Sequence, residues 1–124
     1  MKKTCMIFSV LFLVFSLTMC SGWKEGLEKL DSLEINEPDL EGISDGSYRG
    51  SCEGGPVLVE VEVEVKDNAM KTIVLLKHRN GKGKDAEAII DDILQAQSLD
   101  VDVISGATYS SKAILKAIDN ALNE

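Results

Sequence analysis

The chain has 124 residues, 44% of them hydrophobic, which fits a single domain and excludes a multi-domain assembly. Beyond Gly22 it carries eleven of the thirteen basic residues and all twenty-one acidic ones, a net charge of −10. Such a charge repels phosphate groups, so we expect no nucleic-acid partner and no docking on anionic lipid headgroups.

The N-terminus has the charge order of a secretory signal peptide. Lys2 and Lys3 precede an uncharged run from Thr4 to Gly22, whose apolar core is short for a membrane span of about 20 residues. We therefore expect residues 1–20 to be a signal peptide and to stand outside the fold. A permanent transmembrane helix is the weaker alternative.

Leu17-Thr18-Met19-Cys20 resembles a bacterial lipobox. The resemblance implies cleavage before Cys20, which then carries the lipid that anchors the protein on the outer side of the cytoplasmic membrane. Met19 departs from the small residue usual before that cysteine, so plain secretion to the periplasm or medium and an uncleaved anchor stay open. With Cys5 removed in the signal peptide and Cys20 lipidated, Cys52 is the one remaining thiol and no internal disulfide is expected; without lipidation, Cys20 and Cys52 can pair.

The stretch 21–44 separates this signal from the compact part. Trp23, Leu27, Leu30 and Leu33 recur at helical spacing and predict a short amphipathic helix. Because its polar face is not basic, docking on the domain or a loosely ordered spacer is favoured over a membrane-surface helix. Residues 35–45, with Pro38, Gly42 and four carboxylates, are typical of a linker, which leaves 45–124 as the domain.

Strands open the compact part. Valines alternate with Leu58 and three glutamates from Val57 to Val65, which predicts a strand with one buried and one wet face in an antiparallel sheet. Residues 66–69 form a turn into a second strand over 70–77, and residues 46–52 are a shorter opening strand broken by 53–56.

Two helices follow. From Asp85 as N-cap, apolar residues fall on one face at 86, 89, 90, 93 and 94. A second helix carries Ile114 to Leu122, with Ser110 and Ser111 as possible caps, and a brief extended piece at 101–104 lies between the two. Strands followed by helices predict an α+β fold, a small antiparallel sheet packed with two helices.

The residues offer little catalytic chemistry. There is one histidine, no pairing of cysteine with histidine for a metal, and no carboxylate pair set apart from the acidic background, so neither a metal site nor a catalytic residue is expected. Residues 81–84, Gly-Lys-Gly-Lys, lack the four-residue span and the Ser or Thr after the lysine that a nucleotide-binding P-loop requires. The remaining candidate is the segment 102–111, which places small and hydroxyl-bearing residues directly before a helix.

A helix N-terminus of that kind suits an anion. Ser105, Thr108, Ser110 and Ser111 can donate hydroxyl hydrogen bonds, while Gly106 and Ala107 let a phosphate approach the backbone. From the residues alone, a turn followed by a helix cap is the plainer interpretation.

Asp102 to Thr108 match the Asp-x-x-Ser-Gly-Ala-Thr pattern of the FMN-binding domain family. That family includes flavoprotein subunits of sodium-translocating NADH:quinone reductase, subunits of related ferredoxin-oxidising membrane complexes, and small secreted flavoproteins. Residues 45–50, 54–56, the valine strand and 114–122 also resemble it, so the likeness covers almost the whole domain and implies FMN as the cofactor.

In covalent members a flavin transferase takes FMN from FAD and joins its phosphate to the motif threonine, releasing AMP. The resemblance therefore implies Thr108 as the attachment site, with Asp102 serving recognition or activation and the other residues of 105–111 around the phosphate. His78, followed by Gly81 and Gly83, stands where the family often has a histidine loop near the flavin, though longer members continue differently. A surface or hydrogen-bonding histidine is the alternative, and Tyr109 either stacks on the ring or packs.

The expected function is electron transfer by a membrane-tethered extracytoplasmic flavoprotein. Its partners would be the membrane, a flavin transferase for maturation, and an unidentified redox protein. Since no residue resembles a substrate-binding or acid–base group, a carrier is favoured over a stand-alone enzyme. The rivals are a non-covalent FMN-binding or sensing module and a cofactor-free surface lipoprotein.

Overall fold

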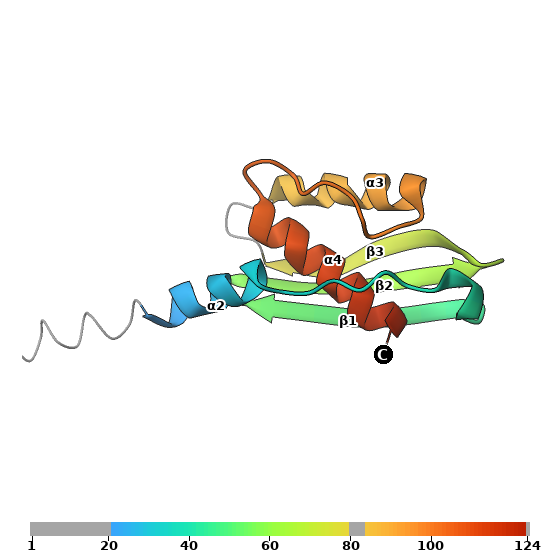
Figure 1. Cartoon of the computed structure of the whole chain (residues 1–124), viewed down its shortest axis with the longest axis horizontal. Helices are drawn as coiled ribbons and strands as arrows, with labels where there is room; N and C mark the ends of the chain where they lie inside the picture. Colours follow the sequence, from blue (N-terminus) through green and yellow to red (C-terminus); the bar gives the residue numbers. More distant parts are fainter. Residues whose placement is uncertain (1–20, 80–83, 124) are drawn as a thin grey trace, which may run out of the picture.

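The computed structural model describes residues 21–79 and 84–123. Its centre is a three-stranded antiparallel sheet in the order β1 (Gly46–Gly54), β2 (Val57–Lys66) and β3 (Ala69–Arg79). Helices α3 (Ile89–Ala96) and α4 (Thr108–Asn123) cover one face of this sheet, and α2 (Ser21–Asp31) projects from one end (Figure 1). The predicted α+β architecture is confirmed.

The valine strand lies in the middle of the sheet. Its five valines, from Val57 to Val65, are at most 3% exposed, and they face the helices while the glutamates between them reach water. The turn into β3 places Asp67 and Asn68 at φ angles of 53° and 60°. Two successive left-handed residues give the type I′ turn that matches the twist of a tight hairpin. The predicted hairpin is therefore confirmed, with β3 extending to Arg79.

Strand β3 does not alternate as regularly as β2. Its register against β2 shifts twice, between Glu60 and Val61 and between Glu64 and Val65. Each irregularity adds a residue on β3, so its inward-facing side chains are Met70, Ile73, Leu75 and His78 at uneven spacing. Val74 and Leu76 are left exposed on the outer face.

Helix α4 packs on β1 and β2, and it crosses β1 at Gly50, where the strand has no side chain. A Cβ atom on Gly50 would collide with the carbonyl oxygen of Ala117 and would lie 2.5 Å from the amide nitrogen of Ala121. Asn120 also donates from Nδ2 to the carbonyl of Ser51 at 2.9 Å. The backbones of helix and strand are therefore in direct contact.

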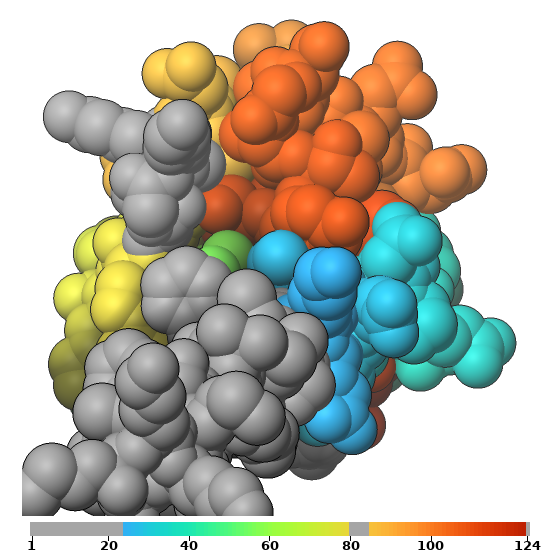
Figure 2. Space-filling model, turned by 90° about the vertical axis from the view of Figure 1, so that its left-hand side faces the viewer, coloured from blue at the N-terminus to red at the C-terminus, as the bar shows by residue number. Residues whose placement is uncertain are grey.

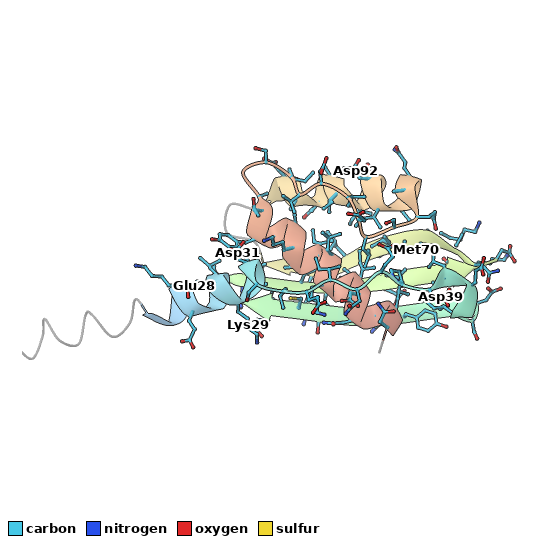
Figure 3. All side chains as sticks on the ribbon, viewed as in Figure 1. Glu28, Lys29, Asp31, Asp39, Met70 and Asp92 are labelled. Atoms are coloured by element: carbon cyan, nitrogen blue, oxygen red, sulfur yellow. The ribbon has the colours of Figure 1, made fainter. Side chains whose placement is uncertain are left out.

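Helix α3 is fixed over β3 by its C-terminal residue. Gln97 adopts a left-handed φ of 53° and donates its backbone N–H to the carbonyl of Ile93 at 2.8 Å. Its side chain accepts from Met70 N–H at 2.7 Å and donates to Met70 O at 2.9 Å. Met70 itself belongs to β3 and is 2% exposed (Figure 3).

Two helix starts differ from the prediction. Asp85 lies in a 3-10 turn, η2 (Lys84–Ala88), and the α-helix proper begins at Ile89 with Ala88 as N-cap. Ser110 and Ser111 are not caps, because α4 already begins at Thr108 and both serines are buried in its first turn. The turn at Gly106, which precedes α4, accounts for this earlier start.

Residues 32–39, the strap, run along α4 and bond to the domain. Asn36 donates its backbone N–H to Asp119 Oδ2 at 3.0 Å, and Glu37 accepts from the backbone N–H of Leu99 at 3.0 Å and from the Ser98 hydroxyl at 3.0 Å. Pro38 is buried, and a short 3-10 helix, η1 (Leu40–Gly42), follows. This part of the expected linker is therefore attached along its length.

Candidate functional site

A tight turn introduces α4. Gly106 has a φ of +80°, a left-handed value that disfavours side chains, and a Cβ built on it would meet no atom within 4 Å. Ala107 then donates its N–H to the carbonyl of Ile104 at 3.0 Å, which closes the turn. No atom covers the backbone of Gly106 on the side where a Cβ would lie, so a ligand can approach the backbone there.

Ser111 holds this turn from inside the helix. It is fully buried, and its hydroxyl accepts the N–H of Ile104 at 3.1 Å while donating to the carbonyl of Ala107 at 2.8 Å. Both hydrogen-bonding roles of the hydroxyl are thus used within the protein. Ser111 positions the motif, and it is not free to bind a phosphate as a donor.

The first turn of α4 presents its N–H groups at the same place. Its first residues have no intrahelical acceptor, and Ala107, which precedes the helix, has no side-chain oxygen to cap them. Thr108 is the first residue of the helix and is half-buried. An anion at Thr108 would therefore meet unpaired N–H groups and the positive end of a 16-residue helix.

The other predicted residues lie around this turn at different depths. Asp102, Ser105 and Gly106 are exposed, Ala107 and Ser110 are buried, and Tyr109 is 42% exposed. Tyr109 is therefore outside the hydrophobic core, which leaves its ring available to a ligand.

His78 is the buried polar side chain at the end of β3. It lies opposite Val59 on the helix-covered face, and its side chain is only 4% exposed. Its Nδ1 lies 3.0 Å from Glu87 Oε1 in η2, which packs against α4. Its Nε2 is buried and has no hydrogen-bond partner among the described residues.

The end of β3 and the start of α4 occupy the same end of the molecule (Figure 1), and Figure 2 looks onto that end. An unpaired buried imidazole nitrogen costs free energy unless a ligand or water meets it.

Glu87, which fixes His78, was not predicted, because nothing in the spacing of these two residues signals a contact. Gly81, Gly83 and Cys20 lie outside the described residues.

A groove of about 470 Å³ lies beside α4. It runs between the strap and the segment that leads to the motif, and its lining mixes apolar and acidic side chains, namely Ile35, Leu99, Val101, Val103 and Leu115 with Glu37 and Asp100. Lys112 also lines it, with its ammonium group bonded to Asp31.

These features fit a flavin mononucleotide. Its phosphate matches the uncapped N–H groups at Thr108, and the negative charge of that phosphate matches the positive helix end. Among residues 21–79 and 84–123, no cluster of side chains suits a metal ion.

Comparison with known proteins agrees with this geometry. The model of the FMN-binding domain family matches residues 54–123, more than half of the chain. The chain belongs to the FMN-binding domain family. The match includes β2, β3, α3, α4 and the turn at Gly106, so FMN is the cofactor that this fold binds.

A curated relative extends the comparison. An uncharacterized protein of Treponema pallidum (strain Nichols) is 28% identical over 85 residues, which are 66% of this chain and 24% of that protein. The chain thus spans about a quarter of the length of this relative. In the part of the chain that the structure describes, no helix is long and apolar enough to cross a membrane.

Proposed function

We propose that this FMN-binding protein is an electron carrier tethered outside the cytoplasmic membrane, with FMN joined through its phosphate to Thr108. The observation that carries the proposal is the position of Thr108. Its hydroxyl belongs to the first residue of α4, directly after an exposed glycine and an alanine without a capping group.

Attachment by a flavin transferase has a defined balance. The Thr108 hydroxyl oxygen forms a bond to the FMN phosphorus of FAD, the pyrophosphate bond breaks, AMP leaves, and the hydroxyl proton is lost. The remaining phosphodiester carries one negative charge, which the N-terminus of α4 stabilises. Asp102 is exposed six residues before Thr108, where a transferase can reach it.

The bound flavin would supply one- and two-electron chemistry, and this chain would position it and limit its access. Tyr109 can stack on the ring, and His78 Nε2 offers a buried polar atom that a ligand at this end can satisfy. Lipidation at Cys20 would supply the tether, with an uncleaved N-terminal segment as the other form of anchor.

The test is the intact mass of the protein after co-expression with a flavin transferase. We expect an increase of one FMN less one water, and Thr108→Ala should abolish it. Ser105→Ala removes another exposed hydroxyl from the same turn and should leave the increase unchanged.

Two results would contradict the covalent assignment. Flavin that leaves the protein on denaturation and filtration would make this a non-covalent binding module. A colourless wild-type protein that folds but takes up no flavin would make it a cofactor-free surface protein.

A further inference from the structure

Helix α2 is attached to the domain through its middle and its C-terminal end. Leu30 is fully buried in the core, and a Cβ on Gly26 would collide with the backbone of Gly55 in the turn between β1 and β2. At its C-terminal end, Lys112 donates to the Asp31 carboxylate at 2.7 Å and to the Asp31 carbonyl at 3.1 Å. These contacts fix residues 26–31 of α2 on the domain.

The same contacts place α2 at the end that carries the flavin site. Lys112 lies one helical turn after Thr108, so its bond to Asp31 joins α2 to the start of α4. Asp31 lies beside α4 in Figure 3, and in Figure 2 the segments of α2, β3 and the start of α4 share one face. The turn at Asp67 and Asn68 lies at the other end of β2. Because β2 has ten residues, its two ends are about 33 Å apart.

The uncharged N-terminal run leads straight into this docked helix. It ends at Gly22, and the described part of α2 starts at Ser21, so the two overlap in the sequence. A lipid on Cys20 and an uncleaved apolar segment would both attach within one residue of α2. The helix itself is about 16 Å long for its 11 residues.

We propose that α2 is a rigid spacer that turns the Thr108 end of the domain toward the lipid bilayer. This inference rests on the tether in the proposed function, but it does not depend on bound flavin. The surface that the domain would face is the lipid bilayer.

Charge does not supply this orientation. The chain beyond Gly22 has a net charge of −10, so anionic headgroups repel the domain instead of attracting it. The packing of α2 on the domain therefore has to fix the orientation of the domain relative to the bilayer. As a consequence, a redox partner would reach the proposed flavin from the membrane side.

The test is resonance energy transfer to dye-labelled headgroups in phosphatidylcholine vesicles that carry the full, membrane-recovered protein. A fluorescent non-natural residue replaces either Ser105, exposed in the motif turn, or Asn68, exposed in the distant hairpin turn. We expect transfer from position 105 to be at least about twofold more efficient, because β2 alone separates the two ends by about 33 Å.

A flexible insertion provides the matched control. Twenty Gly/Ser residues between Cys20 and Ser21 leave the fold intact and should abolish the difference between the two positions, since such a chain spans about 25 Å at random. Equal transfer in the unmodified chain, or stronger transfer from position 68, would overturn the proposal, as would recovery of the chain in the soluble fraction. Thr108→Ala should keep the difference, which separates this result from any failure of flavin attachment.

Discussion

Among the acidic residues that the structure describes, Asp119 is the most completely buried. It is 2% exposed, and its carboxylate accepts hydrogen bonds from Lys116 Nζ at 2.8 Å, Asn123 Nδ2 at 2.7 Å and the Asn36 N–H at 3.0 Å. Burial by itself raises the pKa of this carboxyl. The three hydrogen bonds and the charge of Lys116 outweigh burial, so the pKa of Asp119 lies below its ordinary value of 3.8.

Asp119→Asn should therefore destabilise the protein in a pH-dependent way. A carboxyl with a lowered pKa contributes stability above its ordinary pKa of 3.8 and loses it as pH falls through the lower value in the folded state. We expect a loss of about 2 kcal/mol in the free energy of unfolding at pH 7. The difference from wild type should shrink as the pH falls below 3.8.

Urea unfolding followed by circular dichroism between pH 3 and 7 measures this difference. Asp91→Asn is the control, because Asp91 is an exposed carboxylate on α3. A gap between Asp119→Asn and wild type that stays constant over the whole pH range would show that the charge of Asp119 contributes nothing.

Single residues also show why parts of the site could not be predicted. The hydroxyl of Ser111 was expected to face a phosphate, but it bonds to Ile104 and Ala107 instead. Whether a hydroxyl points outward or back into its own turn depends on where the helix begins. That start is fixed by the left-handed Gly106, whose conformation the sequence does not reveal.

At the scale of elements, β1 and α4 lie in direct backbone contact at Gly50. Gly50 lies beneath Ala117 and Ala121, with no space for a side chain between strand and helix. Overpacking of this kind forces the backbone to shift.

Gly50→Ala should push α4 away from β1 and lower the free energy of unfolding by about 1 to 3 kcal/mol. Chemical denaturation measures the change. Ser51→Ala alters the exposed neighbour on the outer face of the sheet and should stay within about 0.5 kcal/mol of wild type. If both variants unfold at the same denaturant concentration, the contact between strand and helix is looser than described.

Elements with a clear period were predicted from sequence, and elements set by tertiary contacts were not. The alternation from Val57 to Val65 specifies β2 and its buried face. The uneven inward set of β3 depends on two register shifts, so the burial of His78 was not predictable. Pro38 and the carboxylates of the strap are typical of a linker, and only the hydrogen bonds of Asn36 and Glu37 show that it is bound.

At the scale of the whole molecule, size limits how far a flavin can be covered. The domain has a single small core, and its motif turn is exposed at Asp102, Ser105 and Gly106. A flavin held there would keep part of its ring accessible to a partner.

The flavin-loaded protein should therefore be reduced rapidly by dithionite and reoxidised by soluble quinones or ferric chelates, with no turnover on NADH alone. Stopped-flow absorbance of the flavin band measures both half-reactions, and Thr108→Ala provides the flavin-free blank. Efficient NADH oxidation without a separate reductase would rule out the carrier function and require a nicotinamide site.

The central claim is that the flavin is attached to Thr108, and peptide fragmentation tests it most directly. Cleavage after Lys84 and Lys112 releases one peptide, 85–112, that contains Thr108 together with the other hydroxyls of the motif. After co-expression with a flavin transferase, mass spectrometry of this peptide should place the flavin phosphate on Thr108 alone. Flavin on Ser105, Ser110 or Ser111, or an unmodified peptide from a protein that is yellow before denaturation, would contradict the account.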